Sequence, residues 1–173
     1  VVPWRRARTR ESTPLVNTLP PDAPFPPDRD WKVAALWDYW VGVWQSCGRM
    51  PRRADIDPID IPKLLPNVWM LDYEPAGGRY RYRLIGTAVT RAWDGDITGR
   101  YLDAEIPDFA RSALARELDA VVKAGRPGWR RAEPSWTPAP QDVVGIERLA
   151  LPLAGDDGAV AMVLCVSVYR QRN

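Results

Sequence analysis

The sequence predicts an α+β fold: a five-stranded antiparallel sheet with helices mainly on one face, and one further helix at the N-terminal end. Three observations lead to this expectation. Five short segments are rich in β-branched, aromatic or alternating apolar residues. Glycine-containing turn signals join two pairs of these segments, which indicates hairpins. The last segment is apolar at nearly every position, as is typical of a central strand covered on both faces.

Length and charge limit the class of protein. The chain has 173 residues, which suits one domain plus a tail. Its net charge of +2, with basic and acidic side chains interleaved, does not indicate a nucleic-acid partner. No stretch approaches the roughly 18–20 apolar residues of a membrane span, and no apolar run follows the basic N-terminal residues as in a secretory signal. We therefore expect a cytoplasmic protein without a membrane partner.

The complete absence of histidine restricts the chemistry most. Without imidazole, the chain cannot form a Ser/His/Asp or Cys/His nucleophilic site, a common zinc site or a histidine-ligated haem. Cys47 and Cys165 are far apart in apolar surroundings, which favours buried free thiols over a disulfide. Acid–base catalysis by carboxylates stays open, but caps and turns are the ordinary role of the candidates: Asp55, Asp57, Asp103 and Glu147. We therefore expect no catalytic residues.

The N-terminal region is predicted to differ from the rest. Residues 1–30 contain seven prolines, which favour an extended arm ahead of a domain at residues 31–170. The cluster of Arg5, Arg6, Arg8 and Arg10 in the arm could contact an acidic partner, although a solvated tail is the simpler interpretation. Residues 31–46 then show a helical pattern that is apolar around most of its circumference. Such a helix has to be covered on more than one side, which is the first indication of a homodimer.

The segment from Met50 to Pro66 carries several aspartates. Asp57 is expected to cap a short helix that begins at Pro58. Asp55, Asp57 and Asp60 could instead hold a hard cation, but the glycine and the terminal glutamate of a calcium loop are missing. We expect no metal here.

The remaining elements follow in order. Residues 68–73 and 80–85 are predicted to form a hairpin, in which Tyr80, Tyr82 and Leu84 alternate with three arginines, so that one face is buried. A short helix at 86–93, a loop at 95–99 and a longer helix at 107–124, ended by Gly125, come next. Strands are predicted at 129–133, 143–153 and 160–169, with a turn at 155–158 between the last two.

This order resembles the PAS fold, and four stretches strengthen the resemblance: Met50–Pro66, Arg79–Thr87, Asp96–Asp103 and Leu149–Leu153. They are similar to a stand-alone PAS-domain family common in alphaproteobacteria. The resemblance implies a sheet that cups a cavity beneath its helices, a role in sensing or protein association, and frequent dimerisation. It implies neither a particular ligand nor catalytic residues. Histidine-bound haem lacks its ligand here, and no flavin-binding motif with a reactive cysteine is present.

Two functional hypotheses follow. In the first, a non-catalytic sensor binds a small apolar or aromatic molecule in a cavity whose candidate residues are Tyr80, Tyr82, Leu84, Trp93, Trp129, Leu149 and Cys165. These side chains could equally fill a solid core. In the second, a dimeric adaptor with a filled core and no ligand docks through its tryptophan-rich helix, with Trp31, Trp37, Trp40 and Trp44 as anchors. Either way, the signal has to leave through a partner protein.

Overall fold

The computed structural model describes residues 21–93, 95–133 and 143–172, and it contains the predicted order of elements. Helix α1 (Trp31–Cys47) comes first, followed by the hairpin of β1 (Val68–Glu74) and β2 (Arg79–Ile85). Three helices come next: α2 (Thr87–Ala92), α3 (Leu102–Glu105) and α4 (Ala113–Ala124). Strands β3 (Gly128–Ala132), β4 (Val143–Ala154) and β5 (Val160–Gln171) complete the fold.

The five strands form one antiparallel sheet in the order β2-β1-β5-β4-β3. The most apolar strand, β5, is therefore central, as predicted. Residues 155–158 turn β4 into β5: the N–H of Gly155 donates to the carbonyl of Ala159, and Gly158 has a φ of 83°, which favours glycine. The predicted α+β class with a five-stranded antiparallel sheet is confirmed.

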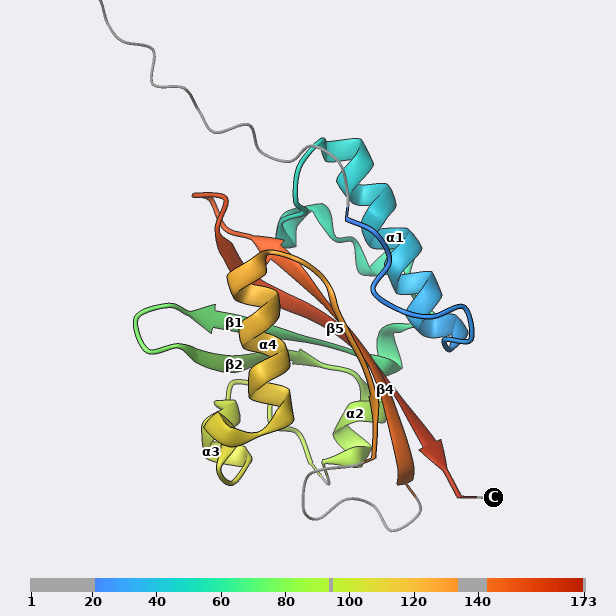
Figure 1. Cartoon of the computed structure of the whole chain (residues 1–173), viewed down its shortest axis with the longest axis vertical. Coiled ribbons are helices and arrows are strands. Elements are labelled where there is room, and N and C mark those ends of the chain that lie inside the picture. Colours follow the sequence, from blue (N-terminus) through green and yellow to red (C-terminus); the bar gives the residue numbers. More distant parts are fainter. Residues whose placement is uncertain (1–20, 94, 134–142, 173) are drawn as a thin grey trace, which may run out of the picture.

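Each face of the sheet has its own hydrophobic core. In β1, β4 and β5, every second residue packs with α1. The residues between them pack on the other face, with α2, α3 and α4. In β5, for example, Leu164 and Val166 belong to the first core, whereas Val163 and Cys165 belong to the second. The two sets alternate because successive side chains of a strand point to opposite faces. Figure 1 shows α1 and α4 on either side of β4 and β5.

Helix α1 begins at an aspartate cap and packs its indoles inside the chain. The side chain of Asp30 accepts from the N–H of Lys32, and Gly48 ends the helix in the left-handed region. Trp37, Trp40 and Trp44 are buried against one another and the sheet. The helix is thus covered mainly by its own chain, which explains its nearly all-round apolar pattern.

The helix predicted from Pro107 begins only at Ala113, because the side chain of Ser112 accepts from the N–H of Ala115 and caps it. A separate short turn of 3-10 helix, Phe109–Arg111, precedes it. Asp108 has a φ of 50° between Pro107 and this turn, so the backbone is not continuously helical. Helix α3 has only four residues, and no pattern in the sequence predicted it.

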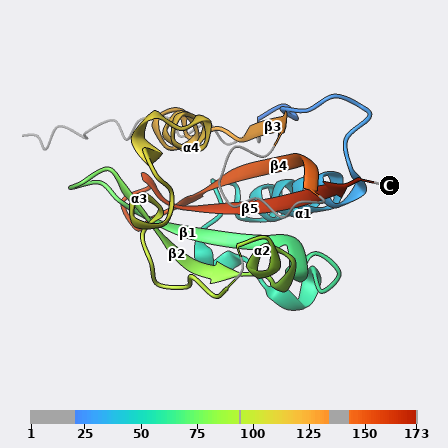
Figure 2. The same ribbon diagram turned by 90° about the horizontal axis from the view of Figure 1, so that it is seen from below.

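The predicted arm is described only from residue 21, and residues 1–20 lie outside the described part. The described end of the arm packs on the domain. The ring of Phe25 packs edge-on against Trp37, at 5.7 Å between centroids, and Asp28 forms an ion pair with Arg131 of β3. Figure 2 shows this segment passing beside β3 before it enters α1.

Candidate functional site

A cavity of about 80 Å³ lies between the sheet and the helices on the α4 side. Its walls come from α2, from the start of α4 and the residues before it, and from all five strands. Strand β2 contributes only Tyr82. Four aromatic side chains line it: Trp69, Tyr82, Trp93 and Tyr169. Polar side chains line it as well: Ser112, Arg130, Glu133, Arg148 and Ser167. The cavity wall therefore combines aromatic and aliphatic side chains with several polar groups that could orient a small molecule.

Arg148 is a charged side chain at the inner wall of this cavity. It projects from β4, a strand that is otherwise almost wholly apolar, and its side chain is 14% exposed. Its Nη2 and Nε donate to the carboxylate of Glu117 on α4, the shortest distance being 2.8 Å. Burial acts to lower the pKa of Arg148, but the Glu117 carboxylate outweighs burial and leaves the pKa above its ordinary value. The arginine therefore stays charged.

Glu117 holds only one edge of the Arg148 guanidinium. No acceptor among the described residues lies within hydrogen-bond distance of Nη1. Arginine has five N–H donors in a planar fork, so two donors on Nη1 remain for another group. A buried donor without an acceptor is costly unless water or a ligand meets it.

Tyr82 brings a second polar group to the cavity. The side chain is 1% exposed, and its hydroxyl forms no hydrogen bond with any described residue. Burial raises the pKa of Tyr82, and the nearby Tyr169 adds to the rise while Arg148 opposes it. Burial also raises the pKa of Tyr169 to about 12. Both phenols therefore stay neutral at ordinary pH and keep an O–H to donate.

Trp69 and Ser167 form a polar contact in the same wall. The indole N–H of Trp69 donates to the hydroxyl of Ser167 at 2.9 Å, joining neighbouring strands β1 and β5. The guanidinium of Arg148 lies 5.9 Å from the centre of the Trp69 ring. These contacts hold the side chains of Trp69, Ser167 and Arg148 in position in the cavity wall.

The structure brings together only some of the predicted cavity residues. Tyr82 and Trp93 line the cavity. Tyr80 and Cys165 lie in the same core but outside the lining, and the hydroxyl of Tyr80 donates to Asp119 at 2.7 Å. Burial raises the pKa of the Cys165 thiol, so it is not a reactive thiolate.

The other three predicted cavity residues lie elsewhere. Leu149 and Trp129 pair across β4 and β3 and pack on the α1 face. Leu84 is 38% exposed, because the register of β1 and β2 shifts at Met70 and Leu71. Leu84 then pairs with Met70, a residue of the α1-side core, whereas Tyr82 pairs with Leu71 on the α4 side. The simple alternation used in the prediction is wrong across this bulge.

Four residues of the cavity wall were not predicted from the sequence: Trp69, Arg148, Ser167 and Tyr169. A usable signal existed for Arg148, because a charged residue inside an almost wholly apolar strand needs a buried partner. The other three carry no such signal, since aromatic and small hydroxyl residues are common in ordinary strands.

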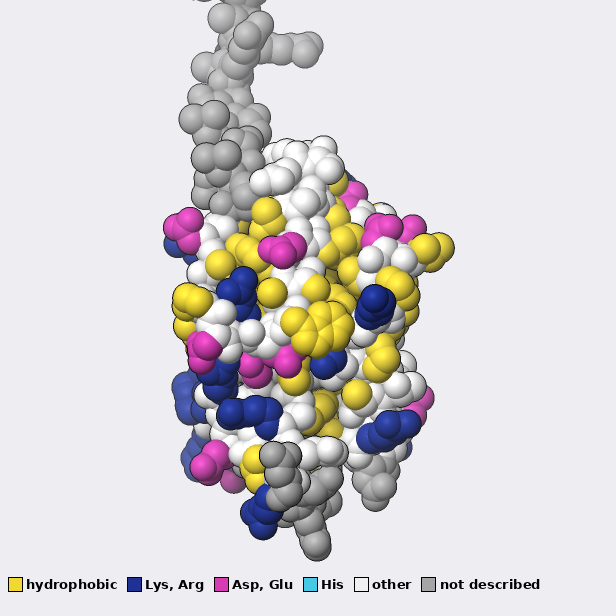
Figure 3. All heavy atoms as spheres, turned by 90° about the vertical axis from the view of Figure 1, so that its right-hand side faces the viewer, with side chains coloured by type: hydrophobic (Ala, Val, Ile, Leu, Met, Phe, Trp, Pro, Cys, Tyr) yellow, Lys and Arg dark blue, Asp and Glu magenta, His cyan; other side chains and the backbone are white. Residues whose placement is uncertain are grey.

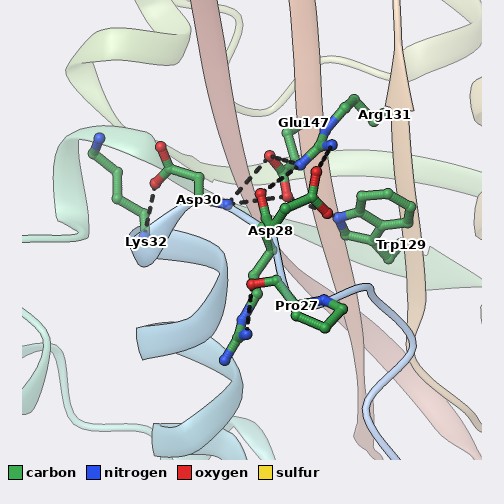
Figure 4. Close-up of polar contacts among 8 residues, drawn as sticks. Pro27, Asp28, Asp30, Lys32, Trp129, Arg131 and Glu147 are labelled. Atoms are coloured by element: carbon green, nitrogen blue, oxygen red, sulfur yellow. Dashed lines mark hydrogen bonds and ion pairs between the residues drawn. The ribbon is translucent and has the colours of Figure 1, made fainter.

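Glu147, one of the carboxylates considered for acid–base chemistry, holds the N-terminal segment instead (Figure 4). It is 3% exposed, and its oxygens accept from Nε1 of Trp129 at 3.0 Å and Nη2 of Arg131 at 3.1 Å. They also accept from the backbone N–H of Asp30, at 3.3 Å each. This carboxylate therefore joins β3, β4 and the start of α1.

The remaining carboxylates also have structural partners. Asp55 pairs with Arg49, Asp103 pairs with Arg79, and Asp57 caps the short 3-10 helix Pro58–Asp60 as predicted. Within the described ranges, no group of three or more His, Cys, Asp or Glu side chains is arranged to hold a metal ion. In the same part of the chain, no helix is both long and apolar enough to cross a membrane.

The site does not suit a flavin held through a cysteine. About 80 Å³ is well below the roughly 300–1,000 Å³ of cofactor-sized pockets. Neither thiol reaches the cavity: Cys165 is buried in the core beside it, and Cys47 ends α1 on the opposite face. A smaller molecule is a better match for these walls.

Comparison with known proteins completes the description. A family model described as PAS domain matches residues 30–167, which is most of the chain. No curated protein sequence matches. Among solved structures, a sensory box sensor histidine kinase from Vibrio cholerae is similar at 13% identity and a TM-score of 0.48, covering 66% of this chain and 92% of that one. A LOV protein from Rhodobacter sphaeroides is similar at 12% identity and a TM-score of 0.45, covering 66% and 68%.

Proposed function

The chain belongs to the PAS domain family, and on that premise we propose that it is a non-catalytic sensory module that binds a small molecule in the cavity beside α4. The observation that carries the proposal is the cavity wall. It combines aromatic side chains with a partly buried charge, Arg148, and with the hydroxyl of Tyr82. The described residues give neither Nη1 of Arg148 nor the Tyr82 hydroxyl a hydrogen bond, so both donors are available to a ligand in the cavity.

The arrangement of β3 and β4 supports a route from the cavity to the rest of the molecule. Arg130 and Arg148 pair across the two strands and face the cavity, whereas their neighbours Arg131 and Glu147 pair on the other face. Arg131 and Glu147 hold the segment before α1. A ligand that shifts these strands would therefore act on the N-terminal segment, and from there on a partner protein.

Indole N–H signals in a two-dimensional ¹⁵N NMR spectrum test this function. Trp69 and Trp93 line the cavity, whereas Trp40 and Trp129 lie on the α1 face. We expect at least one member of a panel of small acids, amides, amines and aromatic hydrocarbons to shift the first pair and leave the second pair in place. The variant Ala113→Leu, which adds bulk at the cavity wall, should abolish the shifts. A panel without any selective shift would refute small-molecule sensing.

A dimeric adaptor is the second candidate, and one exposed patch favours it. Trp31 is 54% exposed and Ile59 is 82% exposed. A shallow groove beside them is lined by Trp31, Ala35, Tyr39 and Leu64 among others. Figure 3 shows apolar side chains gathered between charged ones on the side of the molecule toward α1. Of the four predicted anchors only Trp31 is available, because Trp37, Trp40 and Trp44 are buried within the chain.

Native mass spectrometry tests the adaptor. A dimer that Trp31→Ala turns into a monomer, while Trp129→Phe leaves it intact, would support docking through this patch. A monomer at high protein concentration would count against a homodimeric adaptor.

A further inference from the structure

Two side chains of the cavity wall, Arg148 and Tyr82, carry donors that the described residues leave without an acceptor. The two N–H groups on Nη1 of Arg148 have no acceptor among the described residues, since Glu117 occupies only Nε and Nη2. The Tyr82 hydroxyl likewise has no partner in the described ranges, although the side chain is 1% exposed. Both side chains line the same cavity, and the Arg148 charge acts on Tyr82. Two donors in the wall of one cavity suit a group with two acceptor atoms.

The charges around the cavity favour an anion at this wall. Arg148 and Glu117 compensate each other, but Glu117 does not line the cavity, so a ligand meets the guanidinium and not the carboxylate. The other charged lining residues, Arg130 and Glu133, are of opposite sign, and Glu133 is exposed at the rim. A hydrogen bond from a charged donor to a carboxylate is roughly twice as strong as a neutral one.

The size of the cavity limits the ligand. About 80 Å³ is open to the centre of a water-sized sphere, and one water needs about 10–15 Å³ on this measure, so the cavity has room for a small molecule with about as many non-hydrogen atoms as a handful of waters. Part of the wall is apolar, formed by Val89, Ile106 and Ile146 among others. A short alkyl group suits this part.

We infer that the cavity binds a short-chain monocarboxylate, whose oxygens accept from Nη1 of Arg148 and from the hydroxyl of Tyr82 while its alkyl group lies against the apolar wall. This inference rests on the proposed function, because it names the ligand class of the same cavity. The Glu117 ion pair has a defined role in it. It holds the guanidinium at the wall with its free edge toward the ligand.

A pair of nearly isosteric probes tests the inference. Propionate and propionamide have similar size and shape, but only propionate has two acceptor atoms and a negative charge. The full chain is titrated with each probe at constant ionic strength, with chloride as the salt control, and the indole signals of Trp69 and Trp93 are followed. We expect propionate to bind at least tenfold more tightly than the amide.

Two variants address the proposed contacts. Tyr82→Phe removes only the hydroxyl and is expected to weaken propionate binding about fivefold, the equivalent of one ordinary hydrogen bond. Its matched control is Tyr80→Phe on the same strand and face, because the Tyr80 hydroxyl donates to Asp119 outside the cavity and should not affect binding. Arg148→Lys keeps a positive charge beside Glu117 but loses the fork, and is expected to weaken binding at least tenfold.

The outcomes separate the inference from the proposed function. Equal binding of acid and amide, or equal affinity in Tyr82→Phe, Arg148→Lys and wild type, would overturn the carboxylate inference while the cavity remained a ligand site. If neither probe moves Trp69 or Trp93 but another compound of the panel does, only the carboxylate inference fails. If no compound moves them, both fail.

Discussion

The backbone N–H of Asp30 lies 3.3 Å from each carboxylate oxygen of Glu147, 117 positions further along the chain. Asp30 is also the cap of α1, so a single residue starts the helix and ties it to the sheet. Because Glu147 also accepts from Trp129 and Arg131, one buried carboxylate on β4 accepts hydrogen bonds from the cap of α1 and from two side chains of β3. The start of α1 is thereby set by a contact that no local pattern encodes.

Glu147→Ala should lower the free energy of unfolding by roughly 2–4 kcal/mol, because it leaves the buried donors of Asp30 and Trp129 without an acceptor and Arg131 without its ion-pair partner. Urea unfolding measures the change. Glu133→Ala, on an exposed residue just after β3, is the control and should stay within about 0.5 kcal/mol of wild type. Equal effects of the two substitutions would contradict the role assigned to Glu147.

Glu117→Gln should destabilise the fold by roughly 3–5 kcal/mol, since it leaves the Arg148 charge uncompensated between α4 and β4. The double variant Glu117→Gln/Arg148→Met removes the buried charge and should recover much of the loss. A double-mutant cycle from urea unfolding gives the coupling between the two side chains. Additive effects would show that the ion pair does not act as a unit.

Gly86→Ala should be destabilising by roughly 3 kcal/mol, because a Cβ at this position would collide with the backbone of Leu65 and Pro66 rather than with movable side chains. Gly42→Ala is the matched control. It lies in α1 with no atom within 4 Å of its would-be Cβ, so alanine should stabilise the helix by about 0.5–1 kcal/mol. Thermal unfolding of both variants checks the opposite signs.

Acid should weaken the fold partly through Asp55. The hydrogen bonds from Arg49 hold the pKa of Asp55 below its usual value of 3.8. A carboxyl whose folded-state pKa is lowered adds stability above its unfolded pKa, and this stability is lost as the pH falls through the folded-state pKa. The difference in unfolding free energy between wild type and Asp55→Asn should therefore shrink from pH 6 toward pH 2. A difference that stays constant over this range would contradict the assignment.

Several parts of the fold could be predicted because their signals are local. Asp57 and Pro58 form a cap and a first turn within three residues, and Gly125 ends α4 with a φ of 60°. The apolar run of β5 predicted a central strand, and the strand is central. The start of α4 was wrong by six residues, because both Pro107 and Ser112 are suitable at a helix start and only the conformation of Asp108 separates them.

The candidate site was harder to predict, because it depends on which face of each strand the helices cover. The alternation of residues placed Tyr80 and Tyr82 on one face, and the apolar runs predicted a sheet with a buried centre. The packing of the helices on the sheet places Leu149 and Trp129 under α1, turns Leu84 outward at the bulge and brings Arg148 to Glu117. Alternation and capping depend on residues a few positions apart, so they can be recognised in the sequence. The face of a strand that lines a cavity is set by packing between elements far apart in the chain.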